Sequence, residues 1–113
     1  MKLVKDSIEF AELSSMAEQG FGTMVKAVVD VESGIMAVDA ELHSDQEALL
    51  LENGSAQRDL WGINLYPDVT GDDWIEFDSM INLRPASGNR SRGVDDPVVR
   101  DRIREIVTHL VQR

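Results

Sequence analysis

The strongest constraint on the fold is a pair of alternating apolar segments on either side of Ser33-Gly34. Residues 23–32 and 35–43 alternate apolar and polar side chains, a pattern typical of half-buried β-strands. A two-residue turn at Ser33-Gly34 puts eight apolar residues on one face, in the pairs Val31–Met36, Val29–Val38, Ala27–Ala40 and Val25–Leu42. The sequence therefore predicts an antiparallel hairpin with one buried face.

A second hairpin is predicted over residues 59–66 and 74–84, and a short edge strand over residues 1–5. Pairing Tyr66 with Trp74 directs Trp61 to the core and places Tyr66 and Trp74 on the opposite face, where they could stack a ligand or shield a dimer contact. The same face then collects further polar residues, namely Asn64, Glu76, Asp78, Asn82 and Arg84.

Three helices complete the predicted order. The first begins with a capping box at residues 6–9 and ends at Gly20, and the second is capped by Ser44 and ends at Asn53-Gly54. The third begins at residues 95–97 and carries an apolar stripe of Val99, Ile103, Ile106, Val107 and Leu110. We therefore expect one α+β domain over residues 1–113, ordered helix-strand-strand-helix-strand-strand-helix. Its four-stranded, mainly antiparallel sheet is built from two hairpins, with the helices packed on one face.

Composition limits the kinds of partner that the protein is expected to bind. The chain of 113 residues has a formal charge of −10, which argues against binding nucleic acid or an anionic membrane surface. It has no cysteine, no signal-peptide pattern and no apolar stretch long enough to span a membrane. We therefore expect a cytoplasmic protein.

Three long blocks are distinctive: FGTMVKAVVDVESGIMAVDAELHSDQEALLLENGS, LWGINLYP and IEFDSMINLRPASGNRSRGVDD. With these blocks the chain resembles, over nearly its whole length, a small bacterial family catalogued only as a domain of unknown function. The resemblance implies no activity, cofactor or partner. It does imply a small residue such as glycine near position 39, so Asp39 departs from the family pattern.

The first candidate site is the polar sheet face. Asp39, Glu41 and His43 alternate, so a strand would project two carboxylates and an imidazole from one side. That set suits a divalent metal or a carboxylate–histidine base, and Glu41, His43 and Asp78 are the catalytic candidates. The alternative is a solvated face on which Lys26 pairs with Glu41.

The second candidate is an arginine-rich segment, residues 79–94, which contains three arginines and no acidic residue. By contrast, residues 1–78 carry four basic and seventeen acidic residues. Arginine on a glycine-rich loop before a helix can cradle a carboxylate or phosphate. The ligand-binding candidates are Asn64, Asn82, Arg84, Asn89, Arg90 and Arg92. In the alternative, the arginines fold back onto Asp39, Glu76 or Asp78.

These sites support three hypotheses about function. The favoured one is a non-enzymatic binding or regulatory module that receives an anionic ligand or a protein partner at the polar sheet face rimmed by the arginines. The second is a small metal-assisted hydrolase that uses Asp39, Glu41 and His43 with a divalent metal. The third is a homodimer in which the polar faces of two copies meet.

Overall fold

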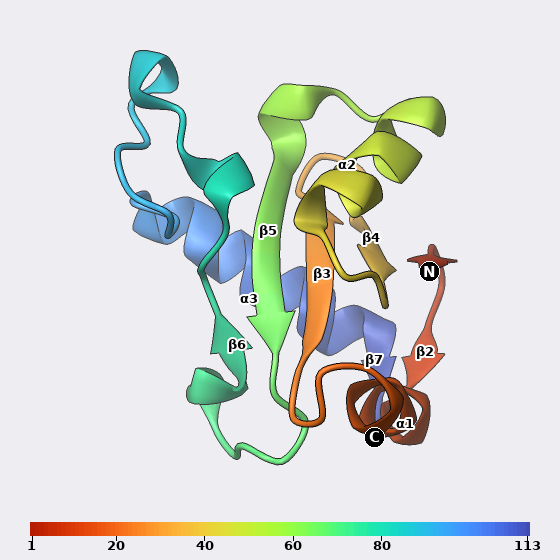
Figure 1. The fold of residues 1–113 in the computed structure, drawn as a ribbon. Coiled ribbons are helices and arrows are strands. Elements are labelled where there is room, and N and C mark those ends of the chain that lie inside the picture. Colours follow the sequence, from red (N-terminus) through yellow and green to blue (C-terminus); the bar gives the residue numbers. More distant parts are fainter.

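The fold is built around a five-stranded antiparallel sheet with the order β1-β4-β3-β5-β6 (Figure 1). The computed structural model describes all residues, 1–113. The strands of this sheet are β1 (Lys2–Val4), β3 (Val25–Asp30), β4 (Ile35–Val38), β5 (Leu60–Leu65) and β6 (Ile75–Glu76). The prediction of a four-stranded sheet from two hairpins therefore lacks one strand. The predicted edge strand, β1, pairs with β4 and becomes the fifth strand of the sheet.

The hairpin of β3 and β4 buries the predicted face only as far as Val38, and it does not have the predicted register. Ala40 and Leu42 lie beyond β4, and Leu42 is exposed. Val29 lies opposite Met36 and Ala27 opposite Val38, two residues away from the expected pairs. The chain turns over four residues rather than two, because the buried carboxylate of Asp30 holds the turn. Its Oδ1 accepts hydrogen bonds from the backbone N–H groups of Glu32 at 2.9 Å and Ser33 at 3.0 Å. A shift of two residues keeps every side chain on its face.

The helices cover both faces of the sheet, which corrects the prediction that all pack on one (Figure 1). They are α1 (Phe10–Gln19), α2 (His43–Glu52) and α3 (Pro97–Leu110). The larger core joins α1 and α3 to the face of Val25, Ala27 and Val29. On the other face, Leu50 of α2 packs on Val28 and Ala37. α2 covers that face only in part, and the polar residues lie beside it.

The helix ends agree with the sequence in part. Asp96 caps α3 as expected, accepting a hydrogen bond from the N–H of Val98 at 2.9 Å. The capping boxes predicted for the first two helices are not formed. α1 begins after Glu9 and α2 after Leu42, and neither has a side-chain cap. Ser44 therefore lies inside the first turn of α2, and that turn carries backbone N–H groups without a capping side chain.

The second hairpin has the predicted register, with Leu65 opposite Ile75 and Asn64 opposite Glu76. Its second strand ends at Glu76 instead of residue 84, and the chain continues through short 3-10 helices, η3 (Met80–Asn82) and η4 (Pro85–Ser87). Two others, η1 (Gln57–Asp59) and η2 (Asp72–Trp74), precede β5 and β6. Tyr66 and Trp74 were predicted to share the face opposite the core, and this is wrong for Trp74. η2 turns its ring into the core, where it packs against Phe10.

A second, two-stranded sheet was not predicted. β2 (Ile8–Glu9) pairs in parallel with β7 (Val111–Gln112), so Ile8 lies opposite Val111. Both residues are buried in the larger core. This short pairing leads directly into α1 on one side and follows α3 on the other, and it holds the two helices together.

Candidate functional site

A cleft of about 510 Å³ opens on the sheet face beside the beginning of α2. We call it the sheet-face cleft. Its lining comes from five parts of the chain: Met24, Lys26, Leu42, His43, Ser44, Asn64, Tyr66, Glu76, Asp78, Ser79, Met80, Ile81 and Arg92. Most of its polar residues belong to the polar sheet face expected from the sequence.

The pairing of β3 with β5 builds the floor of this cleft. Lys26 on β3 lies directly opposite Asn64 on β5, and Asn64 in turn lies opposite Glu76 on β6. These three neighbours project from the face opposite the larger core, because side chains alternate along each strand. The first turn of α2 brings His43 and Ser44 to the same place, and the segment after β6 contributes Asp78 and Ser79.

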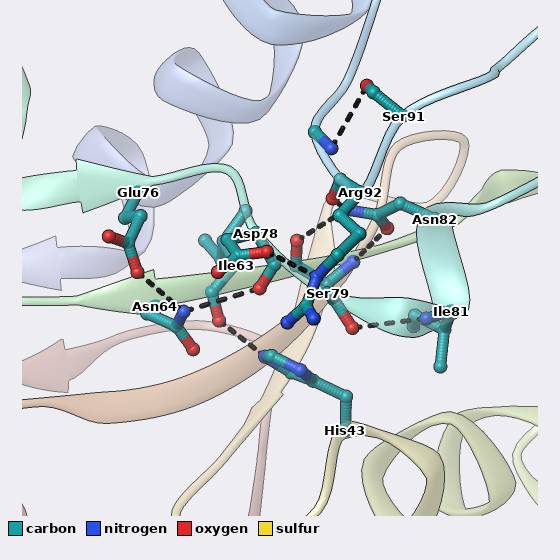
Figure 2. Close-up of polar contacts among 12 residues, drawn as sticks. His43, Ile63, Asn64, Glu76, Asp78, Ser79, Ile81, Asn82, Ser91 and Arg92 are labelled. Carbon is teal, nitrogen blue, oxygen red and sulfur yellow. Dashed lines mark hydrogen bonds and ion pairs between the residues drawn. The ribbon is translucent and has the colours of Figure 1, made fainter.

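His43 is held as a buried, oriented imidazole (Figure 2). Its Nε2 lies 2.7 Å from the carbonyl oxygen of Ile63, so Nε2 carries the proton and donates it. Burial lowers the pKa of His43 below its ordinary value of 6.5, and the nearby charges of Lys26 and Arg92 act in the same direction. The ring is therefore neutral at pH 7, and Nδ1 is left as an acceptor.

A network on β5 and β6 fixes the acidic side of the cleft. The amide nitrogen of Asn64 donates to Glu76 Oε1 at 2.8 Å and to the carbonyl oxygen of Asp78 at 3.3 Å, and the Tyr66 hydroxyl donates to the same Glu76 oxygen at 3.2 Å. Burial and the charge of Glu76 raise the pKa of Tyr66. The side-chain oxygen of Asn64 is buried and has no hydrogen-bond partner in the protein.

Arg92 lies beside Asp78 in the cleft and pairs with it, as in the alternative in which the arginines fold back onto the protein's own carboxylates. Its Nε donates to Asp78 Oδ1 at 2.8 Å, and both side chains remain about half exposed (Figure 2). The two terminal nitrogens of the guanidinium make no hydrogen bond within the protein. Exposed ion pairs of this kind contribute little stability, so Arg92 can engage a ligand at small cost.

Asn82 and Asn89 do not line the cleft, but they position Arg92. The Asn82 amide nitrogen donates to the carbonyl oxygens of Gly62 at 3.0 Å and Arg92 at 2.9 Å. The Asn89 amide nitrogen donates to the carbonyl oxygens of Asn82 at 2.7 Å and Gly93 at 2.9 Å. Both asparagines are buried, and their hydrogen bonds fix the segment that carries Arg92 against the sheet.

The other two arginines of the segment also lie outside the cleft. Arg84 donates to the carbonyl oxygens of Ile81, Arg58 and Leu60, and its guanidinium stacks 4.3 Å from the centre of the Trp61 ring. Burial lowers the pKa of Arg84, although the side chain stays charged. Arg90 is exposed, and only its backbone N–H is engaged, donating to Asp95 at 2.8 Å.

The set of Asp39, Glu41 and His43 is not assembled. β4 ends at Val38 and Asp39 has a φ of 67°, so the predicted alternation along one strand is wrong. The left-handed conformation favours glycine, in line with the small residue that the family resemblance implies there. Asp39 and Glu41 line a neighbouring cleft, whereas His43 lines the sheet-face cleft. No group of three or more His, Cys, Asp or Glu side chains in the protein is placed to hold a metal ion.

Comparison with known proteins identifies the family. A family model described as "Protein of unknown function (DUF5674)" matches residues 2–110. The chain belongs to this family. Comparison with the curated proteins and with the solved structures finds no match to this DUF5674 chain. None of its helices has the length and apolar character that crossing a membrane requires.

Sequence reasoning assigned six ligand-binding candidates, and two of them, Asn64 and Arg92, line the sheet-face cleft of this DUF5674 protein. Asn82, Asn89, Arg84 and Arg90 do not. Lys26 was assigned to the polar face but not to the ligand-binding residues. Tyr66 was expected on that face, to stack a ligand or shield a dimer contact, and Ser44 was assigned only as a helix cap. One feature of the sequence could have identified Lys26 as a binding residue: it is the one charged residue within the apolar run 24–29.

Proposed function

We propose that this protein is a binding module that holds a small anionic ligand in the sheet-face cleft. The observation that carries this proposal is the convergence of two cationic side chains, Lys26 and Arg92, on one cleft beside the beginning of α2. A carboxylate or phosphate group can accept charge-assisted hydrogen bonds from both side chains.

Lys26 is the strongest anchor. Its ammonium forms no ion pair within the protein, and its nearest described partner is the face of Phe21, 5.5 Å from the ring centre. In a chain of charge −10, a half-buried lysine without a carboxylate partner is a site at which an external anion replaces a missing counter-charge.

Each of the two carboxylates of the cleft has one oxygen engaged in hydrogen bonds, which reduces its repulsion of an anion. Glu76 accepts hydrogen bonds from Asn64 and Tyr66, and Asp78 accepts one from Arg92. The free donors beside them include the Lys26 ammonium, the terminal nitrogens of Arg92 and the hydroxyl of Ser44, and the free acceptors include Nδ1 of His43 and the side-chain oxygen of Asn64. Donors and acceptors together suit an anion that also carries a hydroxyl group.

Calorimetric titration with inorganic phosphate and with phosphorylated and short dicarboxylic metabolites, at low ionic strength, tests the proposal. We expect at least one of these compounds to bind, and Lys26→Met or Arg92→Gln to weaken that binding about tenfold or more, since each removes a charge-assisted contact. Asp78→Asn should strengthen binding, because it removes a negative charge and releases Arg92.

Arg90→Ala is the matched control. Arg90 lies on the same loop, two residues from Arg92, but it is exposed and lines no described cleft. The control variant should bind as the wild-type protein does. Absence of binding by every compound, or an equal loss in Arg90→Ala and Arg92→Gln, contradicts the proposal.

A further inference from the structure

A second cleft, of about 610 Å³, adjoins the first. The two share Met24, Lys26 and Leu42 in their linings, so they lie side by side with Lys26 at their junction, and we call the pair the groove. The volume of the second cleft is within the range of small-molecule sites. We call it the apolar cleft, because side chains of α1, of the segment after α1 and of the segment before α2 give it a largely apolar wall.

Exposed apolar side chains gather along this groove. Phe21 is 49% exposed and Leu42 is 54% exposed in the apolar cleft, and Met80, 63% exposed, lies on the wall of the sheet-face cleft. Single exposed apolar residues are ordinary on a protein surface. Three around one groove, beside a lysine without an ion pair, indicate a surface that is covered when a ligand is bound.

Each cleft carries two carboxylates, but only those of the sheet-face cleft, Glu76 and Asp78, accept hydrogen bonds from other side chains. The positive groups lie in the sheet-face cleft and at its junction with the apolar cleft, where the Lys26 ammonium lies 5.5 Å from the centre of the Phe21 ring. The apolar cleft itself carries two carboxylates, Asp39 and Glu41, both exposed. A second negative charge on the part of a ligand that enters the apolar cleft would therefore be repelled.

We infer that the ligand is a free amphipathic monoanion, whose single anionic head lies at Lys26 and Arg92 and whose uncharged apolar chain or ring lies over Met24, Phe21 and Leu42 in the apolar cleft. This inference rests on the proposed function and adds the class of ligand. The apolar contacts supply affinity, and the two carboxylates select against an anion at the far end.

The test uses straight-chain monocarboxylates of four to eight carbons and the α,ω-dicarboxylates of the same lengths, titrated calorimetrically. Each added methylene of a monocarboxylate should raise affinity roughly twofold to fourfold as it is buried. The eight-carbon dicarboxylate should bind more weakly than octanoate, and Glu41→Gln should narrow that difference.

Substitutions in the protein show where the hydrocarbon chain of the ligand lies. Phe21→Ser and Leu42→Ala should flatten the dependence of affinity on chain length, because they lower the affinity for octanoate more than the affinity for butanoate. Val98→Ser is the matched control, since Val98 is 73% exposed on α3 and lines neither cleft. Thermal melts of each variant show that it is folded.

The results separate the inference from the proposed function. If anions bind but affinity does not change with chain length, the inference fails and the proposed function stands. A length dependence that persists unchanged in Phe21→Ser and Leu42→Ala also overturns the inference, because the hydrocarbon chain of the ligand then lies elsewhere. If neither these carboxylates nor the phosphates bind, the proposed function fails first.

Discussion

The carboxamide of Asn82 takes the place of a neighbouring strand for Gly62. Its oxygen accepts from the N–H of Gly62 at 2.8 Å, and its nitrogen donates to the carbonyl oxygen of Gly62 at 3.0 Å. A carboxamide carries the same donor and acceptor as a peptide group, so β6 can end at Glu76 without leaving the edge of β5 unsatisfied. An asparagine that sequence reasoning assigns to a ligand is thus part of the sheet.

Gly62 is also the glycine at which an added Cβ would have least room. A Cβ added there would lie 2.5 Å from the Cβ and 2.6 Å from the Oγ of Ser79. We expect Gly62→Ala to lower the free energy of unfolding by about 2 kcal/mol, since the segment after β6 has to move outward. Urea denaturation measures this loss.

A double-mutant cycle with Ser79→Gly shows whether the contact causes the loss. The second substitution removes both close atoms of Ser79, so the double variant should be more stable than the sum of the two single effects indicates. Strictly additive effects would refute the steric explanation.

At the scale of elements, the hairpin of β3 and β4 shows what alternation can and cannot predict. The period of two fixes which side chains share a face, and Val25, Ala27, Val29, Met36 and Val38 are all in the larger core as expected. Alternation does not fix the length of the turn. That was decided by Asp30, whose buried carboxylate binds the turn and Ser55, a contact between residues 25 positions apart.

The position of α2 was missed for a related reason. Val28, Ala37 and Leu60 form an apolar patch on the face that is otherwise polar, and Leu50 of α2 covers it. Both Val28 and Ala37 are visible in the sequence as apolar residues on the wrong face of the predicted hairpin. The apolar run of α2 has no helical stripe that would show which residue packs inward, and only Leu50 of residues 48–51 is fully buried.

Asp30→Ala tests how strongly the turn depends on its carboxylate. Burial raises the pKa of Asp30, but hydrogen bonds from Ser55, Ser33 and Glu32 outweigh it and hold the pKa below 3.8. We expect Asp30→Ala to lower the free energy of unfolding by about 3 kcal/mol and Ser55→Ala by about 1 kcal/mol. Chemical denaturation at pH 7 measures both losses.

The pH dependence follows from the lowered pKa. The stabilisation by Asp30 is complete above the unfolded-state value near 3.8 and is lost as the pH falls through the lower folded-state value. The difference in melting temperature between wild type and Asp30→Ala should therefore shrink only in strong acid. A difference that already disappears at pH 5 would contradict this account.

At the scale of the whole molecule, the candidate site depends on which strands are neighbours. The sheet-face cleft takes residues from β3, the start of α2, β5, β6 and the arginine-rich segment. Local patterns predicted the polar face of each hairpin separately, but they did not predict that β3 pairs with β5. That pairing, together with the asparagines that place Arg92, decides which of the predicted polar residues meet.

The buried His43 makes the stability of the whole protein depend on pH. Because its pKa is lowered in the folded state, the unfolded chain takes up a proton near pH 6.5 while the folded protein does not. Stability should therefore fall as the pH is lowered from 7.5 to 5.5. In His43→Gln, whose amide nitrogen can still donate to Ile63, this component of the decrease should be absent.

Thermal melts at several pH values measure this effect, with His109→Gln as the control because His109 is an exposed residue of α3. The control should keep the pH dependence of the wild-type protein. Parallel curves for wild type and His43→Gln would show that His43 does not titrate differently in the folded and unfolded states.

The parallel pairing of β2 with β7 has a consequence for folding during synthesis. Ile8 finds its partner only when Val111 has been made, about one hundred residues later. At ordinary translation rates that interval is roughly 5 to 20 s. During this time Ile8 and the apolar face of α1 lack their final cover, so the nascent chain has a period in which a chaperone can bind it, and the last strand added ends that period.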